Sequence, residues 1–180
     1  MNEIKIFDNI ISIEQQNNII NTFLSNDFPW FYLSDITNPF KKNQKRHALS
    51  HGFIKNGKLN SNYFGYVEPI IKNVIKKLKC EKAVLREAIS FLQFPLNIET
   101  DKLDTPHIDI KDSHVVFLYY VTDNEAHTII YLDDEFKKYK KIQPKQGRLV
   151  VFPGSLWHTA EQPTKNIRCI INCNVINEKE

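Results

Sequence analysis

Two segments in the first half of the chain have the hydrophobic spacing of amphipathic helices. Residues 66–79 place apolar side chains at positions i, i+3, i+4, i+7, i+8 and i+11, and lysines cover the opposite face. Residues 12–25 follow a weaker form of this pattern, and Ser12 with Gln15 forms a capping-box signal at the helix start. We therefore predict two helices, each with one face packed on a core.

After residue 82 the pattern changes to short apolar runs that are rich in β-branched and aromatic residues and bounded by turn residues. A short strand is also predicted over 28–33, ahead of these runs. No helical pattern separates the later runs, which argues against parallel βαβ units. The order predicts an α+β, mainly β fold that closes into a jelly roll. The predicted later strands cover residues 83–94, 115–121, 128–132, 148–152 and 167–176.

The polar segment 34–62 predicts a long loop, with Gly52 and Gly57 for mobility. A solvated surface loop is the simplest interpretation of its basic cluster. The alternative is a substrate-facing lid whose charge favours acidic targets. The cluster consists of Lys41, Lys42, Lys45 and Arg46.

The composition narrows the class of protein. The chain has 180 residues, 42% hydrophobic and 25% charged, which predicts one globular domain and excludes disordered, collagen-like and coiled-coil chains. We expect residues 1–82 to form a helical and loop part and residues 83–176 to form the jelly-roll core. No apolar run approaches the roughly 18 residues of a membrane span, and the first residues lack a signal-peptide layout, so a cytoplasmic protein is expected. The abundance of Ile, Asn and Lys fits an A/T-rich bacterial or phage genome.

The charge and the cysteines exclude some partners. The net charge of +3 does not by itself argue for nucleic acid, so a nucleic-acid partner is not expected. Cys80, Cys169 and Cys173 have no zinc-ribbon spacing, and their odd number in a chain without a signal layout predicts free thiols.

Candidate chemistry begins at His107 and Asp109, which are two positions apart and would share one face of a strand. The pair alone is a weak signal, and unrelated polar residues near turns would produce it as well. His158 arrives after a later strand and turn. Two histidines and one carboxylate form the facial triad of non-haem Fe(II) oxygenases.

Arg168 lies within an apolar strand, where a buried unpaired charge is costly. Its partner would be either an internal carboxylate in a structural salt bridge or a dicarboxylate ligand bound by the guanidinium fork.

Together, His107-x-Asp109, His158 and Arg168 ten positions later resemble the 2-oxoglutarate/Fe(II)-dependent dioxygenases, in particular the prolyl-hydroxylase-like branch. The strand FLYYV and the segment KxGRLVVFPGSxxH are similar to the strands of that branch, and the resemblance spans roughly residues 83–176. It implies a double-stranded β-helix, or jelly-roll, core with the N-terminal helices packed outside.

The resemblance also implies roles for single residues. His107, Asp109 and His158 would bind Fe(II), and ascorbate would serve as a reductant. Arg168 would bind the C5 carboxylate of 2-oxoglutarate, the cosubstrate. Tyr120 would hydrogen-bond the same carboxylate, although core packing explains it nearly as well.

Further positions bear on the same pocket. Asn172 lies four positions after Arg168 on the same strand face and would line the pocket. The chain has Phe94-Pro95 where relatives often have Tyr-Pro, and Ala126-His127 where they often have Gly-Gly.

The implied activity is hydroxylation of a C–H bond with O2 and 2-oxoglutarate, and the favoured substrate is a prolyl residue in a peptide or protein. Three alternatives stay open: a non-catalytic jelly-roll binding module, an oxygenase of a free amino acid or small metabolite, and an oxygenase of nucleic acid. The last ranks low because no second arginine follows Arg168.

Overall fold

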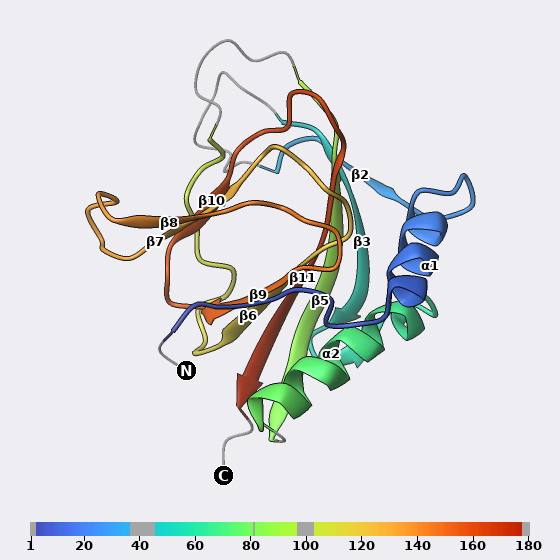
Figure 1. Cartoon of the computed structure of the whole chain (residues 1–180), viewed down its shortest axis with the longest axis horizontal. Helices are drawn as coiled ribbons and strands as arrows, with labels where there is room; N and C mark the ends of the chain where they lie inside the picture. Colours follow the sequence, from blue (N-terminus) through green and yellow to red (C-terminus); the bar gives the residue numbers. More distant parts are fainter. Residues whose placement is uncertain (1–2, 37–45, 81, 97–102, 178–180) are drawn as a thin grey trace.

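The computed structural model describes residues 3–36, 46–80, 82–96 and 103–177, and it consists mainly of strands (Figure 1). Neither helix in these ranges is long and apolar enough to cross a membrane. In chain order the elements are β1 (Lys5–Phe7), α1 (Ile13–Phe23), β2 (Phe31–Leu33), β3 (Ala48–Lys55), β4 (Lys58–Leu59), α2 (Phe64–Leu78), β5 (Ala83–Gln93), β6 (Val115–Tyr120), β7 (Thr128–Tyr131), β8 (Tyr139–Ile142), β9 (Leu149–Pro153), β10 (His158–Ala160) and β11 (Arg168–Asn177).

The strands form two sheets. The larger has the order β1-β9-β6-β11-β5-β3-β2, with β4 paired to β3, and the smaller has the order β10-β7-β8. Every strand pair in the described ranges is antiparallel, as the absence of helices between the later strands predicted. This is the predicted jelly-roll fold.

Strand β11 lies inside the larger sheet, between β6 and β5, and both of its faces are covered. Ile171 and its odd-numbered neighbours join a core with residues from α1 and α2, such as Phe23 and Val74. Ile170 instead packs with Ile130 of β7 in a second core. Because successive side chains of a strand alternate between faces, the larger sheet carries the helices on one face and the smaller sheet on the other.

Both predicted helices are present. α1 begins after Ser12, whose hydroxyl accepts from the Gln15 backbone N–H while the Gln15 side chain accepts from the Ser12 backbone N–H. This is the predicted capping box. In α2 the apolar stripe of the sequence is the buried face, which includes Val67 and Val74.

The prediction of a single loop over 34–62 is wrong in its second half, where β3 and β4 form; residues 37–45 lie outside the described ranges. β3 pairs with β5 along most of its length. The sequence pattern does not reveal β3, because the polar residue His51 is buried at its centre and interrupts the alternation of apolar and polar positions. The ring of His51 is satisfied by the Pro29 carbonyl at 2.8 Å and the Ser61 hydroxyl at 2.7 Å.

The short strands β1, β8 and β10 also escape the sequence pattern, since three or four residues show no clear alternation. The N-terminal part is therefore more than helix and loop. It contributes β1 to one edge of the larger sheet and β2, β3 and β4 to the other edge.

Candidate metal and cosubstrate site

Two chain segments meet beside the smaller sheet and bring the two candidate histidines together. The backbone N–H of His107 donates to the carbonyl of His158 at 2.9 Å, and the N–H of His158 donates to the carbonyl of His107 at 3.0 Å. This reciprocal pair is an isolated antiparallel bridge, so the two side chains start from directly opposed backbone positions. Their ring centroids lie 4.5 Å apart.

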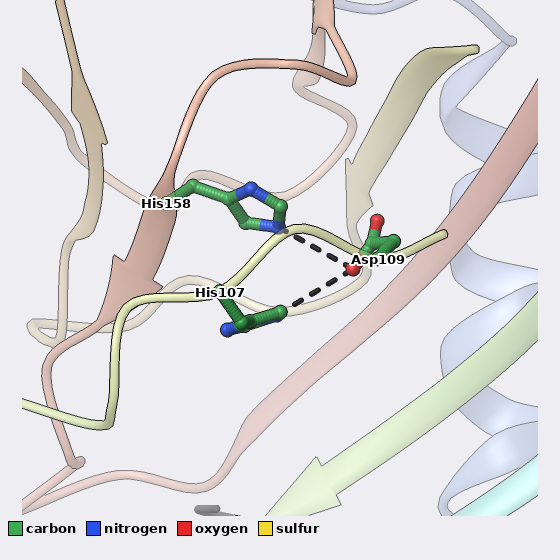
Figure 2. Close-up of side chains that lie close together, drawn as sticks. All are labelled: His107, Asp109 and His158. Carbon is green, nitrogen blue, oxygen red and sulfur yellow. Dashed lines mark ion pairs between the residues drawn. The ribbon is translucent and has the colours of Figure 1, made fainter. Parts of the chain in front are cut away.

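Asp109 completes the group, two residues beyond His107. One carboxylate oxygen, Oδ1, lies 3.5 Å from Nε2 of His107 and 3.4 Å from Nε2 of His158. Figure 2 shows these two contacts converging on that oxygen. One donor atom from each residue falls within 4.8 Å of the others, and no other such cluster of His, Cys, Asp and Glu occurs in the described residues.

The second ring nitrogen of each histidine is held by the backbone. Nδ1 of His107 lies 3.1 Å from the carbonyl oxygen of Thr105, and Nδ1 of His158 lies 3.1 Å from that of Leu156. A protonated Nδ1 donates to each carbonyl, which leaves the lone pair on Nε2. Both rings therefore have the tautomer and the direction that a metal ligand needs.

Asn172 of β11 orients the carboxylate. Its Nδ2 donates to Oδ2 of Asp109 at 3.0 Å, which leaves Oδ1 toward the two imidazoles. Burial alone would raise the pKa of the Asp109 carboxyl, but its contacts with His107, His158 and Asn172 outweigh burial and hold this pKa far below its ordinary value. The carboxylate is therefore charged at neutral pH, as coordination requires.

A cavity of about 270 Å3 opens beside the three residues. Apolar side chains such as Val116, Leu118 and Phe152 form part of its wall. His158 and Asp109 are almost fully covered, whereas the side chain of His107 is 53% exposed, so the group is accessible from the His107 side.

Arg168 lines one end of this cavity and is 4% exposed. Its Nη1 donates to Oε1 of Gln93 at 2.8 Å and its Nη2 donates to Oγ1 of Thr128 at 3.0 Å, both neutral partners. Its Nε is buried without a partner, and no described carboxylate forms an ion pair with it. Burial lowers the pKa of Arg168, but a guanidinium remains charged. This buried guanidinium, which no described carboxylate contacts directly, suits an anionic ligand.

Thr128 connects Arg168 with Tyr120. The hydroxyl of Tyr120 donates to Oγ1 of Thr128 at 2.7 Å, and the guanidinium carbon of Arg168 lies 6.0 Å from the centre of the Tyr120 ring. Since Oγ1 already accepts twice, the hydroxyl proton of Thr128 is free to donate into the cavity. Tyr120 itself is fully buried and does not line the cavity.

A second buried arginine lies near this end of the cavity. Arg46 forms an ion pair with Asp104, and Gln93 donates from Nε2 to the other Asp104 oxygen at 3.3 Å. Gln93 thereby links the two arginines. Arg46 was predicted to belong to a solvated basic cluster, but it is 2% exposed, because its charge is compensated inside the protein. The other members, Lys41, Lys42 and Lys45, lie outside the described ranges.

The residues present fit the metal and the cosubstrate that the resemblance implies. Two imidazole Nε2 atoms and one carboxylate oxygen, all converging, are the donor set of a facial triad. The unpaired guanidinium edge of Arg168 and the Thr128 hydroxyl are donors that suit a carboxylate.

The structure thus brings together all six residues that the sequence singled out, although not all at the cavity surface. Gln93, Thr128 and Asp104 were missed. Gln93 lies opposite Arg168 in the register of β5 and β11, and nothing in the sequence indicates that register.

Comparisons with known proteins agree with this geometry. Residues 96–176 match the family model described as 2OG-Fe(II) oxygenase superfamily. A search of curated proteins finds no match.

Several solved structures share the fold. A prolyl hydroxylase from Trichoplax adhaerens, in complex with a peptide fragment of the hypoxia inducible factor oxygen degradation domain, has a TM-score of 0.70 at 15% identity over 98% of this chain and 84% of that one. The viral collagen prolyl hydroxylase of Paramecium Bursaria Chlorella virus-1, in its 2OG complex, has a TM-score of 0.63 at 15% identity over 98% and 96%.

The shared fold does not determine the reaction. The alpha ketoglutarate dependent epimerase SnoN from nogalamycin biosynthesis has a TM-score of 0.69 at 9% identity, over 98% of this chain and 79% of that one. The family uses Fe(II) and 2-oxoglutarate with O2. The chain thus resembles the 2OG-Fe(II) oxygenase superfamily over residues 96–176, and over nearly its whole length it shares the fold of these solved structures.

Proposed function

We propose that this protein is a hydroxylase in which His107, Asp109 and His158 bind Fe(II) and Arg168 binds the distal carboxylate of 2-oxoglutarate. The favoured substrate is a prolyl residue in a peptide or protein. The convergence of two Nε2 atoms on one Asp109 oxygen carries the proposal. When bound, Fe(II) and 2-oxoglutarate together activate O2 to hydroxylate a C–H bond, while 2-oxoglutarate becomes succinate and CO2.

The protein's own residues bind and orient these groups. Asn172 and the two backbone carbonyls hold the ligand atoms in place before any metal arrives, and such preorganisation lowers the cost of binding. Arg168 and Thr128 supply donors at the far end of the cavity. The apolar wall limits water around the reacting C–H bond.

The prolyl substrate is supported by the sequence resemblance to the prolyl-hydroxylase-like branch and by two prolyl hydroxylases that share the fold. The half-exposed His107 leaves the site open on one side, as a polymer substrate requires.

Anaerobic titration with Fe(II) and 2-oxoglutarate tests the site. The wild type should develop the weak visible charge-transfer band of a chelated complex, and His107→Ala and Asp109→Ala should not. His47→Ala is the control, since His47 contacts Tyr32 and does not line the cavity. Wild-type iron affinity in either site variant would refute the ligand assignment.

A succinate-release screen tests the substrate. Prolyl peptides should stimulate succinate formation, and mass spectrometry should find one added oxygen on proline. Stimulation by free amino acids but by no peptide would instead favour a small-molecule oxygenase.

A further inference from the structure

The cavity continues past the candidate metal site, away from Arg168. On β11, Arg168, Asn172 and Asn174 line the cavity from one face of the strand. Asn172 marks the metal site through its bond to Asp109. Because same-face residues of a strand are about 7 Å apart, Arg168 starts about 13 Å to one side of Asn172 and Asn174 about 7 Å to the other.

Glu87 lines this second end of the cavity. It lies on β5, directly opposite Asn174 in the strand register, and its side chain is half-buried. The other two carboxylates that line the cavity are engaged, Asp104 by Arg46 and Asp109 by Asn172. The carboxylate of Glu87 has no ion pair or hydrogen bond with any residue in the described ranges.

The charges along the cavity are therefore of opposite sign at its two ends. Among the described lining residues apart from the candidate ligand histidines, the one cation is Arg168, at the far end. The walls beside Glu87 include Val116 and Ile89, which supply no compensating charge. A half-buried carboxylate in apolar surroundings gains most from a cationic partner.

We propose that Glu87 is a specificity-determining residue that receives a cationic group of the substrate, an ammonium or guanidinium, on the side of the metal site opposite Arg168. This inference rests on the proposed function, because 2-oxoglutarate must occupy the Arg168 end. The cation comes either from a basic side chain near the target proline or from the amine of a free proline or an N-terminal proline.

The proposal reverses the charge preference that the basic cluster in 34–62 suggested. Arg46, the described member of that cluster, forms an ion pair with Asp104, so its charge is compensated inside the protein. The described end of the cavity beyond the metal site instead carries a negative charge.

Calorimetry on the protein loaded with Co(II) and 2-oxoglutarate tests this without turnover. Three peptides share one proline and differ beside it: lysine, Nε-acetyl-lysine or glutamate. L-Proline and N-acetyl-L-proline form the small-molecule pair. The wild type should bind the charged member of at least one pair about tenfold more tightly than its acetylated partner.

Variants assign that preference to Glu87. Glu87→Gln should abolish it, and Glu87→Lys should favour the glutamate peptide. Glu68→Gln is the matched control, because Glu68 is a partly exposed carboxylate on α2 that pairs with Lys72 and lies outside the cavity lining, so the preference should stay intact. Retained Co(II) and 2-oxoglutarate binding confirms that each variant is folded.

Three outcomes would overturn the inference: equal binding within both pairs, no binding of either charged member, or a preference that survives in Glu87→Gln. The outcomes that would refute the proposed function differ from those that would refute the Glu87 inference. If a neutral prolyl peptide is hydroxylated and no charge preference exists, only the Glu87 inference fails. If the charge preference depends on Glu87 and no proline is hydroxylated, only the prolyl substrate fails.

Discussion

Asn172 lies behind the candidate metal site and holds Oδ2 of Asp109 through a single amide hydrogen bond. Without it the carboxylate loses its fixed rotation and its Oδ1 no longer points at both imidazoles. We predict that Asn172→Ala weakens Fe(II) binding about 10–100-fold while the fold is retained. Anaerobic titration monitored by the charge-transfer band measures this affinity.

Asn166→Ala is the control for that measurement, since Asn166 is exposed in the turn before β11. Equal iron affinity in Asn172→Ala and the wild type would mean that Asp109 is positioned by other contacts.

Arg168 is expected to act on the cosubstrate and not on the metal. Arg168→Ala should raise the 2-oxoglutarate concentration needed for half-saturation, by a free energy of about 2–5 kcal/mol, because a buried charged partner is lost. Arg168→Lys should restore only part of this, since an ammonium cannot reproduce the guanidinium fork. The apparent KM for 2-oxoglutarate in the three proteins is the measurement, and an unchanged value in Arg168→Ala would contradict the role.

Some candidate residues can be found from their neighbours in the sequence, and others only from their contacts in the fold. His107 and Asp109 are two positions apart, and Arg168 is a charge inside an apolar strand, so each is visible in the sequence. Gln93 and Thr128 are ordinary polar residues whose importance comes only from contact with Arg168. That contact depends on strand pairing across long sequence separations, which periodicity does not encode.

The edge strand β1 is joined to the sheet by a side-chain contact as well as by its backbone. Just after β1, Asp8 accepts from Arg148 at 2.7 and 3.0 Å, and Arg148 directly precedes β9. The hydrogen bond from Arg148 holds the pKa of Asp8 below its ordinary value. A lowered folded-state pKa means that the pair stabilises the fold above the unfolded pKa of about 3.9 and loses this effect as pH falls further.

We therefore predict that Asp8→Asn lowers the free energy of unfolding by about 0.2–1 kcal/mol at pH 7, a small value because the pair is partly exposed. The difference from the wild type should shrink as pH falls below about 4. Urea denaturation of both proteins at several pH values provides the test, with the exposed Asp134→Asn as control. A difference that stays constant down to pH 2 would exclude this ion pair as its source.

Elements with a long and regular pattern were predictable, and short or polar ones were not. α2 has four turns with a continuous apolar stripe, and its buried residues match that stripe. β3 has buried Ala48 and Phe53, but His51 is buried through hydrogen bonds to Pro29 and Ser61. A buried polar residue of this kind breaks the alternation on which strand prediction relies.

The three cysteines report on the integrity of the whole protein. All are free, as predicted; Cys169 and Cys173 are buried in β11, and Cys80 is only partly covered. Burial raises the pKa of Cys169 to about 12 and also raises that of Cys173, so neither is reactive in the folded state.

We expect a thiol reagent at pH 8 to modify Cys80 first and the other two only on the time scale of global unfolding. Mass spectrometry of the modified protein counts the thiols, and Cys80→Ser should remove the early phase. Rapid modification of Cys169 in the folded protein would mean that the core around β11 opens locally.

The run of antiparallel strands after α2 was predictable because no helical segment separates these strands. The contribution of the N-terminal part to both edges of the larger sheet was not, since β1 joins β9 from the opposite end of the sequence. Neither chain order nor composition predicts that strands from opposite ends of the sequence pair in one sheet, because that pairing depends on tertiary packing.

The backbone bridge between His107 and His158 has a thermodynamic consequence. A metal bound by both histidines joins two segments that are distant in sequence and that separate when the chain unfolds, so the unfolded chain should bind it far more weakly. Linkage then requires the metal to raise the melting temperature: at one hundred times its Kd it adds about 2.7 kcal/mol to the free energy of unfolding. Differential scanning calorimetry with Co(II) or Ni(II) should show this shift in the wild type and not in Asp109→Ala. Iron supply would in that case set not only the activity of the protein but also how long its folded form survives in the cell.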